Sequence, residues 1–197
     1  MNREKTKIRL LTPAEYRRYG EVDMRFTVSE ELFPVNEIFP FRLEKRRVSP
    51  YRKDLGKYFS VERDAKIFDI ANWAFFMAFD GEKPVGGLTL ACRTEGVNML
   101  ENRSDLCVLW DLRVAEAYRR NGVGSALFSS ALDWAEKHGF SEMKIESQNN
   151  NATAYAFYLK HGAILTEIRR GVYCDEETKN ELQFIWRLPL KKRRRVR

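Results

Sequence analysis

The stretch from Cys107 to Gly124, C-V-L-W-D-L-R-V-A-E-A-Y-R-R-N-G-V-G, constrains the fold of this chain more than any other stretch. Its apolar first half predicts a buried strand, and apolar residues then recur at helical spacing from Gly122 to His138. Gly139 follows at the position of a C-terminal glycine cap. The stretch therefore predicts a strand, a basic turn and a helix in direct succession.

The turn of this unit, R-R-N-G-V-G from Arg119 to Gly124, is a candidate anion site. A turn that enters a helix exposes backbone N–H groups at the positive end of the helix dipole. Glycines let an anion approach that backbone closely, and arginines add cationic donors at its rim. The pattern suits a pyrophosphate, but tight helix packing also explains it. It is neither a Walker loop nor a full dinucleotide fingerprint.

Further apolar runs predict strands on both sides of this unit. The predicted strands are Lys7 to Leu11, Trp73 to Phe79, Pro84 to Cys92, Met143 to Ser147, Ile164 to Arg169 and Leu182 to Leu188. The turn D-G-E-K joins the second and third runs as a hairpin, with Gly81 free to take a positive φ. Thr12 and Pro13 begin a helix as N-cap and first helical residue. The order of elements predicts an α+β or α/β protein with a mixed sheet.

The segment from Met24 to Phe59 has no clear period, because its aromatic residues alternate irregularly with charges and prolines. It is too apolar for a disordered linker, so we expect short helices and ordered loops folded over the core. Such loops either line a pocket or simply cover the sheet, and the sequence favours neither.

Length and charge limit the class of protein. The 197 residues, 44% of them hydrophobic, predict a single domain over residues 1–190 and a tail over 191–197. The tail holds six basic residues of a chain whose net charge is +7, so we expect a solvated tail and no nucleic-acid partner. A role of the tail with RNA, a membrane or an acidic partner is the alternative. The charged N-terminus and the lack of a long apolar run predict a soluble, cytoplasmic protein.

Cysteines and histidines indicate no metal site. The three cysteines, Cys92, Cys107 and Cys174, are widely spaced, which fits neither a disulfide framework nor zinc ligation. His138 and His161 each precede a glycine at a predicted helix end, where capping explains them. We expect no metal.

A second constellation follows the asparagine cluster N-N-N. In the helix predicted from Asn151 to Lys160, Asn151, Ala154 and Tyr158 share one face. The stripe combines an amide, a small residue and a phenol. Capping by Asn151 and core packing by Tyr158 are the structural alternatives.

Together the two constellations resemble the GCN5-related N-acetyltransferase (GNAT) superfamily. Its coenzyme A motif, [RQ]-x-x-G-x-[GA], is matched by Arg119, Gly122 and Gly124. Its later pattern, N-x-x-A-x-x-F-Y-x-x-x-G, is matched by Asn151, Ala154, Phe157, Tyr158 and Gly162. The resemblance covers Cys107 to Ala163. Within the superfamily, D-L-R-V and I-E-S-Q-N-N-N-A-T-A look most similar to streptothricin acetyltransferases and neighbouring antibiotic acetyltransferases.

This resemblance implies a mostly antiparallel central sheet flanked by helices, in which the strand to Val114 and the strand Lys144 to Ser147 (the fourth and fifth of the family) splay apart. It implies acetyl-CoA as cofactor, with the pantetheine arm paired to backbone groups near Leu112 and Val114. The implied cofactor-binding residues are Leu112, Arg113, Val114, Arg119, Arg120, Asn121, Gly122, Val123, Gly124, Asn151, Ala154, Phe157 and Tyr158.

The implied reaction is direct attack of a neutral amine on the acetyl thioester. A backbone N–H near Val114 would stabilise the oxyanion, and Tyr158 would protonate the departing sulfur. Asp111 and Glu146, the carboxylates on the two central strands, are candidates for the base or for a cation anchor. Alternatively each only pairs with an arginine such as Arg113, and water carries the proton. Trp110 stands where some members carry a glutamate.

The implied acceptor is a small-molecule amine, with streptothricin-like and aminoglycoside-like antibiotics as candidates. Acidic residues such as Glu30, Glu31 and Asp64 could recognise a polycation. A polyamine, an amino acid or a protein amine are other acceptors, and a non-catalytic acyl-CoA-binding regulator or an RNA-associated protein belongs to a different class. We expect no membrane partner, and a homodimer is a candidate assembly.

Overall fold

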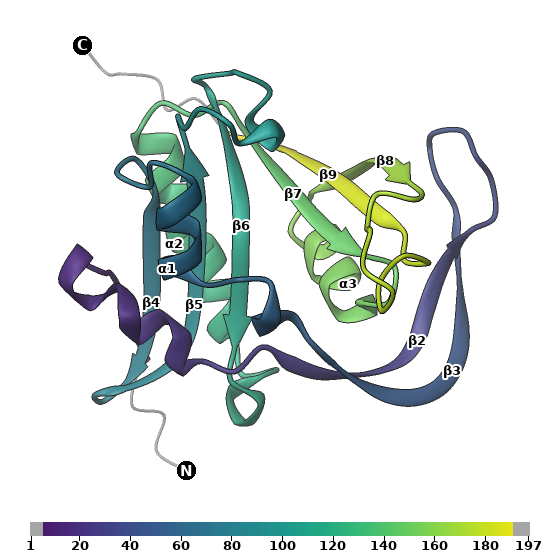
Figure 1. The fold of residues 1–197 in the computed structure, drawn as a ribbon, viewed down its shortest axis with the longest axis horizontal. Coiled ribbons are helices and arrows are strands. Elements are labelled where there is room, and N and C mark those ends of the chain that lie inside the picture. Colours follow the sequence, from purple (N-terminus) through teal and green to yellow (C-terminus); the bar gives the residue numbers. More distant parts are fainter. Residues whose placement is uncertain (1–5, 191–197) are drawn as a thin grey trace. The chain divides into compact units, whose positions relative to one another are not determined.

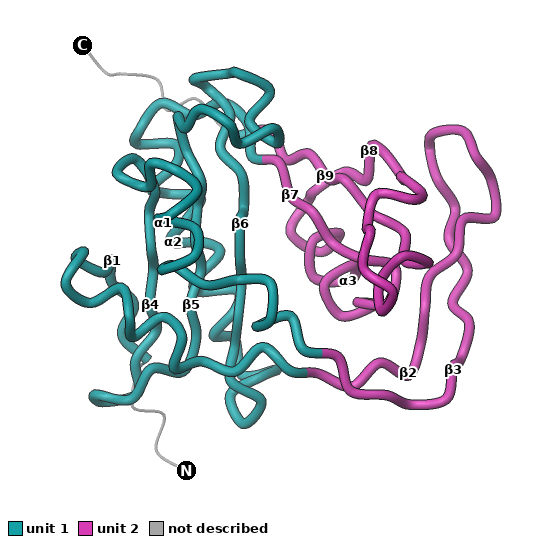
Figure 2. The backbone as a smooth tube through the Cα atoms, viewed as in Figure 1, with its two compact units in different colours: residues 1–25, 54–143, 190–197 teal, residues 26–53, 144–189 magenta. Residues whose placement is uncertain are grey.

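A computed structural model of the protein describes residues 6–190. The chain forms two compact units, each built from separate segments (Figure 2). Of the described residues, the first unit contains 6–25, 54–143 and 190, and the second contains 26–53 and 144–189. The basic tail predicted over 191–197 lies outside the described residues, and the single domain over 1–190 stays a prediction.

An antiparallel sheet forms the centre of the first unit. Its strands are β1 (Lys7–Leu10), β4 (Ala74–Asp80), β5 (Lys83–Cys92) and β6 (Leu106–Val114), in the order β1-β4-β5-β6. The predicted strands are confirmed in this part of the chain. Gly81 takes a φ of 57° in the hairpin turn between β4 and β5, as its sequence predicted.

Helices cover both faces of this sheet (Figure 1). The 3₁₀ helix η1 (Pro13–Glu21) and α1 (Val61–Ile67) lie on one face, and α2 (Val123–Lys137) lies on the other. Two adjacent glycines of β5 let the helices approach closely. A Cβ atom added to Gly86 would lie 3.0 Å from Leu127 of α2, and one added to Gly87 would lie 2.6 Å from the Tyr19 ring. The sheet is therefore packed on both faces.

A β-bulge in β6 changes which residues face the core. Thr89 pairs with Asp111 and Leu90 pairs with Leu109, so Trp110 is an extra residue on its strand. Both Trp110 and Asp111 then reach the core on the η1 side of the sheet, where Trp110 packs on Trp73 at 5.0 Å between ring centroids. The bulge thus places a polar residue and an indole side by side in an apolar layer.

Three strands and one helix form the main body of the second unit. The strands are β7 (Glu142–Gln148), β9 (Gln183–Pro189) and β8 (Ile164–Arg169), in the order β7-β9-β8, and the helix is α3 (Ala152–Lys160). β8 and β9 are antiparallel. Trp186 of β9 anchors the core of the unit, since it is fully buried and donates from Nε1 to Ser147 at 3.0 Å.

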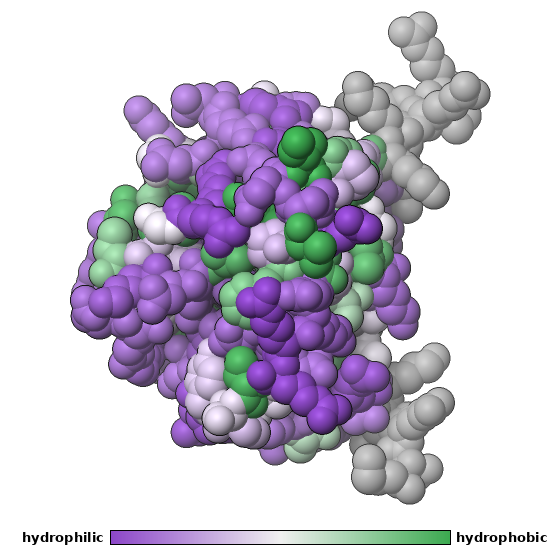
Figure 3. Space-filling model, turned by 90° about the vertical axis from the view of Figure 1, so that its right-hand side faces the viewer, coloured by the Kyte–Doolittle hydropathy of each residue, from purple (hydrophilic) through white to green (hydrophobic). Residues whose placement is uncertain are grey.

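The segment from Met24 to Phe59 corrects the prediction of short helices and loops. It forms a long two-stranded ribbon of β2 (Arg25–Pro34) and β3 (Leu43–Asp54), followed by the short 3₁₀ helix η2 (Leu55–Lys57). Most β3 side chains are exposed, so no buried face imposes an apolar alternation on the sequence. The face of the molecule in Figure 3 is mostly hydrophilic, with hydrophobic residues in small patches.

Two further short 3₁₀ helices, η3 (Asn98–Leu100) and η4 (Glu116–Tyr118), flank β6. Cys92 and Cys107 are buried and Cys174 is exposed, and all three are free thiols. Within residues 6–190, no helix is both long enough and apolar enough to cross a membrane.

Candidate functional site

The turn between β6 and α2 has the geometry of an anion cradle. Gly122 is the N-cap of α2 with a φ of 86°, and Arg120 takes a φ of 65°. The first hydrogen bond of the helix runs from the N–H of Ala126 to the carbonyl of Gly122 at 2.9 Å. The preceding N–H groups therefore have no acceptor within the helix.

The same cradle is open and electropositive. A Cβ atom added to Gly122 would meet no atom within 4 Å, and the first turn of α2 contains no acidic residue. The positive end of the helix dipole is thus uncompensated by the helix itself. This arrangement fits a pyrophosphate such as that of coenzyme A, and the residues predicted over Arg119 to Gly124 are brought together there.

The side chain of Arg119 braces the turn. Its Nε donates to the Val114 carbonyl at 2.9 Å, and its Nη2 donates to the Arg25 carbonyl at 2.8 Å. Tyr118 holds the other side of the loop, because its hydroxyl donates to Asp80 at 2.6 Å. Arg120 and Asn121 are exposed on the turn. Arg119 therefore fixes the shape of the cradle, in addition to the charge it brings.

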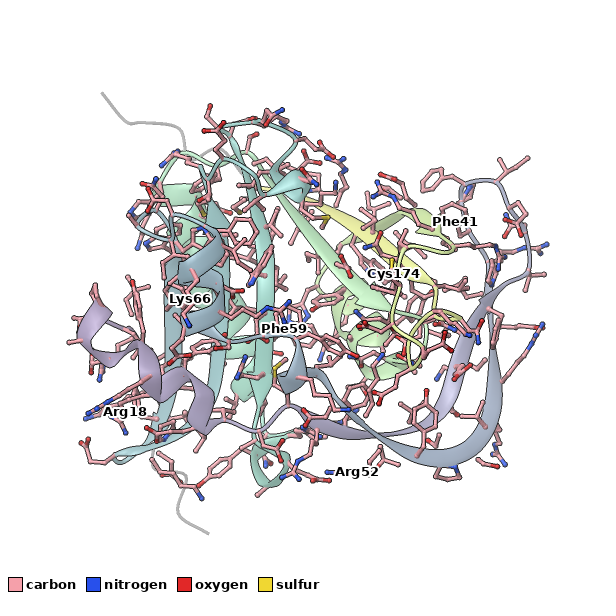
Figure 4. The ribbon with its side chains drawn as sticks, in the orientation of Figure 1. Arg18, Phe41, Arg52, Phe59, Lys66 and Cys174 are labelled. Carbon is pink, nitrogen blue, oxygen red and sulfur yellow. The ribbon has the colours of Figure 1, made fainter. Side chains whose placement is uncertain are left out.

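A pocket of about 470 Å³ opens in the first unit. The two ends of the segment from Met24 to Phe59 contribute to its lining, which is one of the two alternatives that the sequence left open. The lining comes from two segments, residues 20–25 and residues 54–62, together with Arg113. These segments adjoin the two ends of the β2–β3 ribbon. A hairpin brings its ends together, so residues about thirty positions apart line one cavity. Phe59, labelled in Figure 4, lies in the segment that precedes α1.

Carboxylates outnumber guanidinium groups in this pocket. The acidic lining residues are Glu21, Asp23, Asp54 and Glu62, and the basic ones are Arg25 and Arg113. Both basic groups already have acidic partners, since Arg25 pairs with Asp23 at 2.9 Å and Arg113 pairs with Asp111. The pocket consequently favours a cation over an anion.

Asp111 takes the arrangement that the sequence left open as the alternative to catalysis. Arg113 donates from Nε to Asp111 at 2.7 Å, and a second bond from Nη2 completes the pair. Both side chains are buried, and the guanidinium also lies 4.4 Å from the centre of the Tyr19 ring. Burial raises the pKa of the Asp111 carboxyl, and the adjacent guanidinium opposes that rise. Asp111 is thus part of a buried ion pair.

Trp110 is also engaged with a carboxylate. Its Nε1 donates to Asp64 of α1 at 2.9 Å. Asp64 is only 7% exposed, and burial raises the pKa of its carboxyl. Of the three acidic residues considered for polycation recognition, Asp64 therefore lies inside the first unit. Glu30 instead pairs with Lys45 at 3.3 Å, and Glu31 accepts from Tyr51 at 3.2 Å.

The α3 residues combine capping and packing. The side chain of Asn151 accepts from the N–H of Ala154 at 3.0 Å, so Asn151 caps α3. Tyr158 is 6% exposed, and its ring lies 6.0 Å from that of Trp186. His161 ends the helix, with Nδ1 2.8 Å from the Phe157 carbonyl, and His138 does the same for α2 with Trp134.

Glu146 lies at the centre of a polar cluster in the second unit. Tyr173 donates to its Oε1 at 2.8 Å, and Gln183 donates from Nε2 to its Oε2 at 2.7 Å. Gln148 donates in turn to the Tyr173 hydroxyl at 3.3 Å. Burial raises the pKa values of both Glu146 and Tyr173. Sequence reasoning found Glu146 but missed Tyr173 and Gln183, which belong to no motif.

A buried lysine was also missed. Lys53, at the end of β3, contacts Glu181 and donates to Asn150 at 3.1 Å. The amide of Asn150 donates to Tyr51 at 3.1 Å. Burial lowers the pKa of Lys53 despite its acidic partner. This network joins the ribbon to the loop before β9.

The predicted cofactor residues therefore fall into two groups, residues 112–124 in the first unit and residues 151–158 in the second. The geometry within each group is described above. How the two groups act together on one ligand, including the splaying of the two central strands, stays a prediction.

Comparison with known proteins extends this picture. Residues 42–163 match the Acetyltransferase (GNAT) family. Streptothricin acetyltransferase A of Bacillus subtilis (strain 168) is 25% identical over 178 residues, which span 89% of this chain and 95% of that protein. Streptothricin acetyltransferase of Escherichia coli is 29% identical over 166 residues, which span 80% of this chain and 86% of that protein.

A crystal structure shows the same fold. It is that of a Bacillus anthracis str. Ames protein assigned as a streptothricin acetyltransferase, in complex with acetyl coenzyme A. The TM-score is 0.76 at 24% sequence identity, and the match covers 94% of this chain and all of that one.

The fold and the open glycine turn define a mixed, mostly antiparallel α/β acyltransferase that binds a coenzyme A thioester. The chain belongs to the Acetyltransferase (GNAT) family. It is an acetyl-CoA-dependent N-acetyltransferase, as its sequence resemblance implied.

Proposed function

We propose that this enzyme transfers the acetyl group of acetyl-CoA to a primary amine of a small cationic molecule, with streptothricin as the first candidate. The observation that carries the proposal is the acidic pocket of the first unit, where four carboxylates line the cavity and both lining arginines already have acidic partners. Glu21 also pairs with Arg18 at 3.5 Å, which leaves Asp54 and Glu62 as the acidic lining residues without a recorded ion pair among the described residues. Two relatives that align over most of this chain bear the name streptothricin acetyltransferase.

The donor side rests on the turn between β6 and α2. Backbone N–H groups at Val123 and Gly124 would hold the pyrophosphate, with Arg120 and Asn121 at the rim. Leu112 and Val114 would offer backbone groups to the pantetheine arm, and Arg113 would contribute through its backbone because its side chain is committed to Asp111. The bound thioester supplies the acetyl group.

The chemistry assigns different roles to the two candidate carboxylates. Asp111 is buried in an ion pair and has a structural role. Glu146 is half-buried and is bound by two neutral donors, so it is the better base for the acceptor amine. Tyr158 would protonate the departing sulfur, since a phenol of pKa about 10 is a suitable acid for a thiolate. The coenzyme A ligand would also contact Asn151, Ala154 and Phe157.

An acceptor screen tests the proposal. Purified enzyme with acetyl-CoA is assayed for thiol release with streptothricin, a polyamine, an amino acid and a peptide amine. We expect streptothricin to give the highest kcat/KM. The double variant Glu21→Gln with Glu62→Gln should raise the KM for the cationic acceptor several-fold, because each removed surface charge is worth about 0.2–1 kcal/mol.

The exposed Glu95, outside the pocket, provides a matched control for charge removal. Glu95→Gln should leave that KM unchanged. Turnover with a peptide amine alone would replace the proposed substrate class, and cofactor binding without turnover on any amine would indicate an acyl-CoA-binding regulator.

A further inference from the structure

The register of β7 fixes the face of the strand on which Glu146 lies. Side chains alternate along a strand, so Lys144, Glu146 and Gln148 project to one face while Ser147 projects to the other. Ser147 accepts from Trp186 in the core, which fixes the register of the strand. The carboxylate of Glu146 therefore lies on the face opposite to that core contact.

Each oxygen of Glu146 accepts one hydrogen bond from a neutral donor. The Tyr173 hydroxyl lies 2.8 Å from Oε1, and the Gln183 amide nitrogen lies 2.7 Å from Oε2. A carboxylate offers about four acceptor positions in all. The two donors thus fix the plane of the carboxylate while leaving positions that can receive a proton.

The loop that carries Tyr173 is held at its far end. Glu181 contacts the buried Lys53, and the N–H of Leu182 donates to the side chain of Asn149 at 2.9 Å. Between Tyr173 and Glu181, a turn is closed by the N–H of Lys179, which donates to the Asp175 carbonyl at 2.8 Å. Cys174, labelled in Figure 4, marks this loop next to Tyr173. Tyr173 is therefore placed by an ordered loop between β8 and β9.

We propose that Tyr173 and Gln183 are positioning residues that orient Glu146 to accept the proton of the acceptor ammonium. This inference rests on the proposed function. In the step, one N–H bond of the ammonium breaks, an O–H bond forms on Glu146, and the neutral amine keeps the electron pair that attacks the thioester. The C–N bond to the acetyl carbon forms and the C–S bond breaks. Tyr158 gives its proton to the departing sulfur and takes up the second amine proton in its place, and Glu146 returns its proton to solvent.

Other charged groups influence the same carboxylate. Lys144 of β7 and Arg169 of β8 both favour its ionised form, and burial disfavours that form. Tyr173 and Gln183 add hydrogen bonds to the ionised form. Removal of the Tyr173 hydroxyl should therefore raise the pKa of Glu146 further, so that less base is present at neutral pH.

The variant Tyr173→Phe keeps the ring and removes only the donor. We expect kcat/KM for the amine to fall about tenfold or more at neutral pH, since a hydrogen bond to a charged group is worth about 1.5–3 kcal/mol. The pH midpoint of kcat/KM should move upward, and the affinity for acetyl-CoA should stay unchanged. Gln183→Leu should act in the same direction.

Tyr51→Phe is the matched control, because Tyr51 is another hydrogen-bonded tyrosine of the same unit with no contact to Glu146 among its described hydrogen bonds. It should leave the pH midpoint unchanged. In a Glu146→Gln background, Tyr173→Phe should cause no further loss, because the positioned group is already absent. A full additional loss there would overturn the inference.

A titration of the Glu146 carboxyl by NMR separates this inference from the proposed function. An unchanged midpoint in Tyr173→Phe overturns the positioning role, whether or not any amine is acetylated. A wild-type enzyme that acetylates no amine overturns the proposed function, and the proton-accepting role of Glu146 with it. If Tyr173→Phe raises the titration midpoint of Glu146 and also lowers kcat/KM for the amine, the result supports the positioning role and the proposed function.

Discussion

The carboxylate of Asp111 and the guanidinium of Arg113 form a buried ion pair although they lie two residues apart on one strand. Arg113 also donates to the carbonyls of Tyr19 and Val22 at 3.4 Å each. The pair thus ties β6 to the segment that begins the acidic pocket. Arg113 itself lines that pocket, so the ion pair lies at the pocket wall.

Breaking this pair should strongly destabilise the enzyme. Asp111→Asn leaves a buried guanidinium without its countercharge, and we expect a loss of about 3–5 kcal/mol in the free energy of unfolding. Urea denaturation measures it. The double variant Asp111→Asn with Arg113→Met should lose less than Asp111→Asn alone. The exposed pair of Glu167 and Arg169 is the control, and Glu167→Gln should cost at most about 1 kcal/mol.

Gly122→Asp should abolish acetyl-CoA binding while the enzyme stays folded. A carboxylate at this position repels the pyrophosphate, although it suits the helix dipole itself. Gly139, at the other end of α2, has a φ of 85° and equally open surroundings, so Gly139→Asp carries a similar backbone cost. Calorimetric titration with acetyl-CoA should show lost affinity for the first variant alone. Equal affinities would remove the turn from the cofactor site.

Tyr158→Phe should lower turnover more than cofactor affinity. Loss of an acid catalyst typically costs about 10²–10⁴-fold in rate, while the buried ring keeps its contacts with Trp186. Steady-state kinetics and acetyl-CoA titration measure the two effects. Tyr155, which lies 5.2 Å from the same tryptophan ring, supplies the control variant Tyr155→Phe. If both variants retain full turnover, Tyr158 is not the acid.

The stability of the enzyme should fall as pH rises through the raised pKa of Asp64. The folded state holds this proton more tightly than the unfolded state, whose carboxyl titrates near the ordinary value of 3.8. The loss of stability therefore begins near pH 3.8 and is complete above the folded-state pKa. Unfolding free energies at a series of pH values measure this slope.

Asp64→Asn keeps an acceptor for Trp110 and removes the charge, so this variant should lack that part of the slope. It should be more stable than the wild type at neutral pH and equal to it at low pH. The exposed Asp69→Asn is the control, and it should follow the wild-type curve. If Asp64→Asn and the wild type have the same free energy of unfolding at every pH, Asp64 does not cause the pH dependence.

Local sequence predicted the strands and helices that bury one face or both. β4, β5 and β6 are apolar runs with clear ends, and α2 and α3 end at glycines with a positive φ, Gly139 and Gly162. The β2–β3 ribbon escaped prediction because most residues of β3 are exposed and carry no apolar alternation, and β2 buries only Val28 and Leu32. Where solvent faces both sides of a strand, the pattern that normally reveals it is absent.

The sequence by itself determined the glycine turn between β6 and α2, because the backbone conformation of such a turn is one that glycine permits, and that requirement is local. The tertiary structure alone decided the partners of Glu146. Asp111 meets an arginine two residues away, but Glu146 meets Tyr173 and Gln183, which are 27 and 37 residues distant. Strand order and loop closure bring such residues together, and neither leaves a periodic signal in the chain.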